Sequence, residues 1–176
     1  MNSSQEKNEA CLSCEFQENL AILREIDFFS ELPLEILKII AYLCTREKYQ
    51  AGDFLMNQGE DDGQAFYVLS GSLGLMYEDN SNELHMIRDY GPGKFIGGLS
   101  LVGKMRRIYS LKALESTTCL MLTRKKFSTA IAQFPDLTPR LFQAIISRIL
   151  SWEEKMFREH GHHSETCSHI AGVSLV

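Results

Sequence analysis

Short β-rich runs separated by glycines fill the middle of this 176-residue chain, and they constrain its fold more than any other feature. After Tyr49 the strand-forming residues come in runs of about four to eight, most of them ended by a glycine or a polar turn. These runs lie at 54–56, 65–69, 72–77, 84–88, 110–114 and 118–122. The pattern is typical of a small antiparallel barrel or sandwich. The sequence therefore predicts an α+β fold built on an antiparallel, jelly-roll-like β-roll over about 49–123.

Helical periodicity flanks the β-rich region on both sides. Apolar residues recur three and four apart from Phe16 to Ile26, and a second helix follows Pro33. Beyond the roll, closing helices are expected over about 124–160, the last of them long. We expect one domain over 16–160, with flexible segments at 1–15 and 161–176.

The long C-terminal helix is expected to carry one apolar stripe. Its members are Leu141, Ile145, Ile149, Trp152 and Met156. A stripe of this kind can pack back on the roll or form a coiled-coil seam with a second copy. Both alternatives stay open, and a homodimer through this helix is the favoured one.

Composition and charge exclude several classes of protein. The net charge of −5 argues against broad nucleic-acid binding, which needs a basic surface. No run is long and apolar enough to span a bilayer, and the polar start has no signal-peptide pattern. Five cysteines, an odd and scattered set, fit a reducing compartment, so a cytoplasmic location without membrane attachment is expected. Basic residues gather between Gly103 and Lys126, which favours a small anionic ligand there.

The stretch 95–110 joins a glycine pair, one apolar helical turn and a double arginine. Adjacent glycines let the backbone approach an anion closely, and the free N–H groups of a short helix point at it. An arginine one loop away adds charge and forked donors. The predicted ligand-binding residues are Gly97, Gly98, Leu99, Ser100, Arg107, Ile108 and Tyr109. The competing interpretation is a β-bulge glycine pair followed by a solvated basic loop.

Roles within this stretch differ from residue to residue. Arg107 is the expected anion ligand, whereas Lys104 and Arg106 are expected to be solvated charges that raise the local potential. Ser100 is expected to cap or line the short helix, with a direct contact to the ligand as the alternative. Tyr109 faces either the ligand or the outside of its strand.

Catalytic and metal-binding patterns are weak in this sequence. A cupin-like metal centre needs two or three histidines and a carboxylate facing into the barrel, and the β-rich region offers only His85. Cys11 and Cys14 have metal-ligand or redox spacing, but a cluster needs four ligands and only two are local. We expect no enzymatic activity, no catalytic residue, no metal and no cofactor. A redox or metal sensor that uses Cys11 and Cys14 remains an alternative.

The order of these segments resembles the cyclic-nucleotide-binding domain superfamily from Phe28 to Ile149. The segment 28–33 looks like the opening helix of that domain, and 49–60 like its first hairpin. The segment 66–72 is similar to its central strand and glycine turn, and 91–97 to the approach to its phosphate-binding cassette.

The resemblance assigns the cassette residue by residue, with two departures. In the family a Phe-Gly-Glu-Leu-like turn precedes an arginine and a small or hydroxyl residue; Gly97, Leu99 and Arg107 match this pattern. Gly98 replaces the glutamate that binds the ribose 2′-hydroxyl, and Ile108 replaces the small polar residue that helps to hold the phosphate. Losing a charged hydrogen bond of about 1.5–3 kcal/mol and a neutral one of about 1 kcal/mol predicts roughly 10²- to 10³-fold weaker binding of a cyclic nucleotide.

The resemblance implies a stand-alone sensor or regulatory domain. Such a domain binds a small anionic ligand, here cAMP or cGMP, and signals through its C-terminal helix. Direct DNA binding is not expected, because too few residues follow the long helix for a helix-turn-helix domain. The protein partner is unknown. A ligand-free interaction or scaffold protein with a degenerate cassette is the alternative from a different class.

Overall fold

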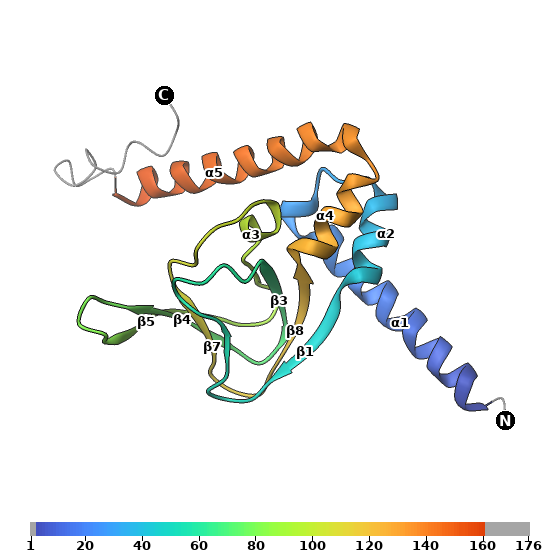
Figure 1. The fold of residues 1–176 in the computed structure, drawn as a ribbon, viewed down its shortest axis with the longest axis horizontal. Coiled ribbons are helices and arrows are strands. Elements are labelled where there is room, and N and C mark those ends of the chain that lie inside the picture. Colours follow the sequence, from blue (N-terminus) through green and yellow to red (C-terminus); the bar gives the residue numbers. More distant parts are fainter. Residues whose placement is uncertain (1–2, 161–176) are drawn as a thin grey trace.

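The computed structural model describes residues 3–160, in which two antiparallel sheets form a roll with helices on either side of it in the sequence (Figure 1). The first sheet has the order β1 (Thr45–Tyr49), β8 (Thr117–Thr123), β3 (Gln64–Ser70), β6 (Phe95–Ile96). The second has the order β2 (Phe54–Met56), β7 (Ser110–Ala113), β4 (Leu73–Glu78), β5 (Leu84–Tyr90). The predicted α+β class with a β-roll is confirmed.

All six strands predicted from glycine-separated runs are present, with ends that shift by one or two residues. Strands β1 and β6 were missed. Strand β6 has only two residues, and Thr45–Tyr49 of β1 is mostly polar and shows no alternation of apolar and polar residues. Strand β1 forms because β8 supplies an antiparallel partner along its whole length, from Thr45 opposite Met121 to Tyr49 opposite Thr117. The roll therefore begins at residue 45 rather than at about 49.

Three helical segments precede the roll: α1 (Ser3–Glu25), η1 (Asp27–Phe29) and α2 (Leu34–Leu43). Helix α1 begins at Ser3, so the expectation of a helix starting only at Phe16 after a flexible stretch is wrong on the helix start. Good helix formers such as glutamate, lysine, glutamine and alanine continue the helix toward the N-terminus without a breaker. The tail expected at 161–176 lies outside the described residues.

One short helix interrupts the roll and three helical segments follow it. These are α3 (Leu99–Val102), then α4 (Arg124–Ala132), η2 (Pro135–Leu137) and α5 (Thr138–His160). The Thr123 hydroxyl caps α4 by accepting a hydrogen bond from the Lys126 N–H at 3.3 Å. From residue 3 to residue 160, no helix has the length and apolar character to cross a membrane.

Helix α5 packs against its own domain through part of the predicted stripe. It contacts η1 and η2, and in Figure 1 it runs along the end of the roll that carries α3. Ile145 packs on the buried core, as the packing alternative expected. The side chains of Leu141, Trp152 and Met156 lie outside the described residues, and Ile149 is half-buried. Phe142, Ile146 and Leu150, spaced four apart, are exposed.

Two hydrophobic clusters form the core. One fills the inside of the roll, where Phe66, Val68 and Leu111 are fully buried. The other joins the helices to the roll, and at its centre lie Phe28 and Phe29 of η1, Phe95 of β6 and Phe127 of α4. The Phe28 ring centroid is 5.0 Å from that of Phe29 and 5.8 Å from that of Phe95. Aromatic contacts of this kind add to the free energy gained by burying the rings.

We expect Gly71→Ala to destabilise the roll strongly. Gly71 has φ +81°, and a Cβ there would lie 2.5 Å from the carbonyl oxygen of Ser116 and from Thr117 Oγ1. The left-handed backbone and the clash together should lower the free energy of unfolding by about 2–5 kcal/mol in urea denaturation. Gly91→Ala is the matched control, because its Cβ would meet nothing within 4 Å; its effect should stay below about 1 kcal/mol. Equal effects of the two substitutions would contradict this account.

Candidate anion-binding site

The cassette begins with a left-handed glycine where β6 ends. Gly97 has φ +88°, and a Cβ there would lie 2.8 Å from the Gln64 carbonyl oxygen and 3.0 Å from Arg107 Nη1. Only glycine fits this conformation and this close approach without strain. Gly98 then caps the N-terminus of α3. The N–H groups of Ser100 and Leu101 donate to the carbonyl oxygens of Gly97 and Gly98 at 3.0 and 3.1 Å.

Arg107 is buried, with 4% of its surface exposed, and it pairs with Asp62. Its Nε lies 3.2 Å from both Asp62 carboxylate oxygens, and Nη2 lies 2.5 Å from Asp62 Oδ1. Nη2 also donates to the Gln64 carbonyl oxygen. The main chains are joined as well, because Arg107 N–H donates to Glu60 O and Gly59 N–H donates to Arg107 O, each at 2.8 Å. The basic loop is thus fixed to the 59–64 segment.

This geometry decides between the two interpretations of the stretch. Arg107 is a buried, oriented cation, so the solvated-loop interpretation is wrong for that residue. It holds for Lys104 and Arg106, which are exposed as expected. Asp62 and Gln64 engage Nε and Nη2, and Nη1 is the guanidinium nitrogen nearest to the position of a Gly97 Cβ, at 3.0 Å against 3.3 Å for Nη2. That nitrogen and the nearby α3 amides are the groups that could hold an anion.

The other predicted residues are placed differently from one another. Ser100 is fully buried, and its hydroxyl lies 2.7 Å from the carbonyl oxygens of Gln64 and Gly97, so it lines the short helix as expected. Leu99 and Ile108 lie at the surface, 48% and 72% exposed. Tyr109 is half-buried against the core of the roll, and this burial raises the pKa of its hydroxyl. The fold therefore brings Gly97, Gly98, Ser100 and Arg107 together.

The neighbouring aromatic rings, rather than the backbone conformation, favour glycine at position 98. A Cβ at this position would lie 2.8 Å from Phe95 Cε1 and 3.1 Å from Phe28 Cδ2. Its backbone is ordinary right-handed helix, with φ −53° and ψ −38°. The glycine that stands at the family's glutamate position is therefore a packing requirement of this chain. The contact with Phe28 was not visible in the sequence, because the two residues are far apart in it.

We expect Gly98→Ala to destabilise the domain because the added methyl would overpack the Phe28 and Phe95 rings. The free energy of unfolding should fall by about 1–3 kcal/mol in thermal or urea denaturation. Gly103→Ala, at the other end of α3, is the control, since its Cβ would meet nothing within 4 Å. The control should change stability by less than about 1 kcal/mol. A neutral Gly98→Ala would show that the rings yield easily.

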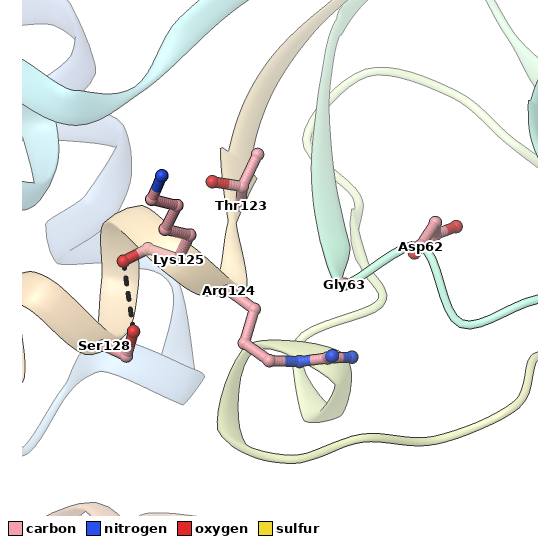
Figure 2. Close-up of a pocket in the computed structure, with 6 residues that line it drawn as sticks. All are labelled: Asp62, Gly63, Thr123, Arg124, Lys125 and Ser128. Atoms are coloured by element: carbon pink, nitrogen blue, oxygen red, sulfur yellow. Dashed lines mark hydrogen bonds between the residues drawn. The ribbon is translucent and has the colours of Figure 1, made fainter.

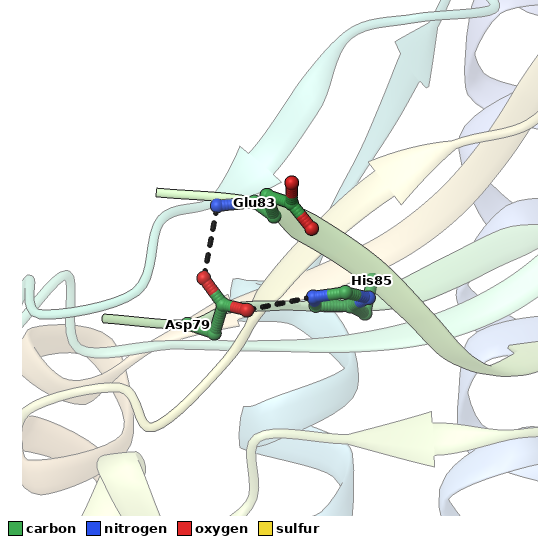
Figure 3. Close-up of side chains that lie close together, drawn as sticks. All are labelled: Asp79, Glu83 and His85. Atoms are coloured by element: carbon green, nitrogen blue, oxygen red, sulfur yellow. Dashed lines mark hydrogen bonds and ion pairs between the residues drawn. The ribbon is translucent and has the colours of Figure 1, made fainter. Parts of the chain in front are cut away.

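A second group of titratable side chains lies on the hairpin between β4 and β5 (Figure 3). The ligand atoms of Asp79, Glu83 and His85 lie within 4.8 Å of one another. The carboxylate of Asp79 is already engaged: one oxygen lies 2.9 Å from His85 Nε2, and the other accepts the N–H groups of Ser81 and Glu83 at 2.8 and 3.0 Å. The hydrogen bond with His85 is the main cause of the lowered Asp79 pKa. In this structure the group closes a turn in which Asn82 has φ +60°.

An open pocket of about 310 Å³ adjoins the cassette at the start of α4 (Figure 2). It is lined by Asp62, Gly63, Thr123, Arg124, Lys125 and Ser128. None of the predicted ligand residues lines it. Figure 2 shows the Arg124 side chain extending away from the first turn of α4.

The described thiols differ in exposure. Cys14 is exposed, and its Sγ lies 3.7 Å from Glu18 Oε1. Burial raises the pKa of Cys44 and of Cys119 to about 12. The side chain of Cys11 lies outside the described residues, so the expected Cys11 and Cys14 site is not tested.

We expect Cys14 to react far faster than Cys44 and Cys119 with iodoacetamide at pH 8. The thiolate is the nucleophile, and below the thiol pKa its population rises about tenfold per pH unit. Because the pKa of the two buried thiols is about 12, their reaction should still be accelerating at about pH 10. Peptide mass spectrometry at timed intervals gives the three rates, and urea-unfolded protein is the control in which they should converge. Cys44 or Cys119 reacting as fast as Cys14 in folded protein would contradict the burial.

Comparisons with known proteins agree with this geometry. The family described as the cyclic nucleotide-binding domain matches residues 46–134. A lysophospholipase of Neosartorya fischeri is 27% identical over 111 residues, which cover 63% of this chain and 7% of that protein. A cAMP-dependent protein kinase regulatory subunit of Blastocladiella emersonii is 30% identical over 122 residues, or 68% of this chain and 30% of that one. The chain thus spans less than a third of either curated relative.

The fold also matches solved structures. The N-terminal domain of a transcriptional regulator from Streptomyces coelicolor superimposes with a TM-score of 0.66 at 22% identity, over 76% of this chain and 95% of that one. The family match extends from β1 to the end of α4 and includes Gly97, α3 and Arg107, half of the whole sequence. By that match, this chain belongs to the cyclic nucleotide-binding domain family.

Proposed function

We propose that this domain is a sensor that binds cAMP or cGMP weakly at the cassette and signals through α5. The observation that carries the proposal is Arg107, buried beneath the Gly97 turn with Nη1 as the nitrogen nearest to it. A buried guanidinium presents its donors in a fixed, forked arrangement, which suits the binding of an anion. The neighbouring N–H groups at the start of α3 add to the field that an anion would meet.

Weak affinity follows from what surrounds Arg107. Asp62 already offers Arg107 a carboxylate, so a phosphate competes for a cation that is not free. The aromatic packing at Gly98 removes the family's ribose contact, and Ile108 exposes an apolar side chain where a small polar one is expected. The predicted loss of roughly 10²- to 10³-fold in affinity is consistent with these features.

Output through α5 is the second part of the proposal. Helix α5 contacts η1, whose Phe28 packs against Gly98 of the cassette. A shift of the cassette turn therefore has a contact path to α5. The exposed face of Phe142, Ile146 and Leu150 is available to a second copy of the chain or to another protein. The described cysteines are free thiols, which supports a cytoplasmic location.

Calorimetric titration with cAMP and with cGMP tests the binding, and fluorescence tests the output. The single tryptophan of the chain, Trp152, lies in α5, so its emission should change on binding if the helix responds. Arg107→Lys keeps the charge but loses the forked donors, and should weaken binding at least about tenfold. Arg106→Ala removes the exposed neighbouring charge and should change affinity less than about threefold.

Two results would reject parts of this proposal. Neither heat nor thermal stabilisation at millimolar nucleotide would reject cyclic-nucleotide binding. Binding without any change in Trp152 emission would reject output through α5. Equal losses in Arg107→Lys and Arg106→Ala would mean that general charge, rather than the cassette arginine, attracts the nucleotide.

A ligand-free interaction or scaffold protein is the second candidate function. The Asp62 carboxylate favours it, because it occupies Arg107 as an internal anion and satisfies the buried charge without a ligand. Under this function the cassette only stabilises the fold, and the exposed face of α5 binds the partner protein.

A further inference from the structure

Arg124 connects three segments that meet at the cassette. As the first residue of α4, it donates through Nε to the Ser100 carbonyl oxygen of α3 at 2.6 Å. Its guanidinium pairs with Asp61, with Nη1 at 3.1 Å from Oδ2 and a second contact from Nη2 to Oδ1. Its backbone N–H donates to the Gly63 carbonyl oxygen at 2.6 Å. One residue thus bonds α3, α4 and the loop before β3.

Helix α3 needs such a partner. It has only four residues, so the carbonyl groups of its last turn have few partners within the helix. The bond that closes it, from Gly103 N–H to Leu99 O, is long at 3.4 Å. A cation at the C-terminal end of a helix satisfies such carbonyl groups and is favoured by the helix dipole. Arg124 supplies this cation from a different helix.

Space for this contact is left by a glycine. A Cβ on Gly63 would lie 3.1 Å from Arg124 Cζ and 3.2 Å from Arg124 Cβ. Gly63 also has φ +62°, in the left-handed region. A larger residue would push the guanidinium away from Ser100 and Asp61. The side chain of Arg124 is mostly buried in this arrangement, with 23% exposed.

Adjacent carboxylates join the Arg124 contacts to the cassette arginine. Asp61 pairs with Arg124, and the next residue, Asp62, pairs with Arg107. The negative charge of Asp62 also acts on Arg124. An anion that engages Arg107 therefore acts beside a carboxylate that is one residue away from the partner of Arg124.

We propose that Arg124 is a positioning residue that fastens the cassette helix α3 to the first turn of α4, so that the two move together. Its relevance to sensing rests on the proposed function, because only then does a ligand displace α3. The fastening itself is present without a ligand, through the Ser100 and Asp61 contacts.

Hydrogen exchange of the nucleotide-free chain tests the fastening. Arg124→Leu keeps the aliphatic stem and removes every donor, and amides of α3 should then exchange at least tenfold faster. Arg124→Lys keeps a charge near Asp61 and should give an intermediate rate. Lys125→Leu, one residue along and exposed, is the matched control and should leave the rates of α3 unchanged.

Amides of β3 and β8 are the internal reference in the same experiment. Their exchange should change less than threefold in Arg124→Leu, since the proposal is local to α3 and α4. Unchanged α3 rates, or an equal acceleration of α3 and the roll, would overturn the proposal, because the first shows no fastening and the second only a general loss of stability.

A nucleotide titration separates this proposal from the proposed function. If wild-type protein binds cAMP or cGMP, Arg124→Leu should weaken binding threefold to tenfold, and Lys125→Leu should not. Faster α3 exchange with unaltered affinity would overturn the link to sensing. If wild-type protein binds neither nucleotide, the proposed function fails, while the exchange rates of α3 still decide the positioning role.

Discussion

The packing of four phenylalanine rings at the junction of helices and roll is the contact on which the rest of this structure depends. Phe28 and Phe29 come from η1, Phe95 from the strand before the cassette and Phe127 from α4. Remove the rings, and the helices before and after the roll lose their common surface. Because Gly98 lies against two of these rings, a change in the packing of the core would also change the geometry of the candidate site.

Electrostatics adds a second layer on the same framework. Each of two neighbouring carboxylates pairs with a different arginine. Asp62 pairs with Arg107 under the Gly97 turn, and Asp61 pairs with Arg124 at the start of α4. Arg107 is buried, and a buried charge without its partner is very unfavourable. The loop that carries both aspartates therefore contacts the cassette and the helices alike, although it lies outside the 95–110 stretch from which the cassette was predicted.

Much of this fold could be predicted from the sequence, because its strands are short, apolar and ended by glycines. Strand β1 was missed because its stability comes from pairing with β8 rather than from an apolar pattern. The Gly97 turn and the short helix after it were predicted from local spacing, and the role of Arg107 as an anion ligand stays a prediction.

The partners of those residues were not predictable in the same way. Asp62 lies 45 residues before Arg107, and periodicity carries no information over that separation. The same holds for Phe28 against Gly98 and for Ser100 against Arg124. Local patterns predicted the residues of the candidate site, whereas only the fold shows which charges and rings surround them.

The contact between Gly98 and the phenylalanine rings also bears on the history of this domain. A single substitution to glutamate would meet the Phe95 and Phe28 rings before its carboxylate could reach a ribose. Recovering the family's contact would first require smaller residues at those ring positions, and they would weaken the junction between helices and roll. The packing of the core thus restricts the side chain that position 98 can carry. Substitutions that preserve this ring packing are therefore more accessible to the chain than a glutamate at position 98.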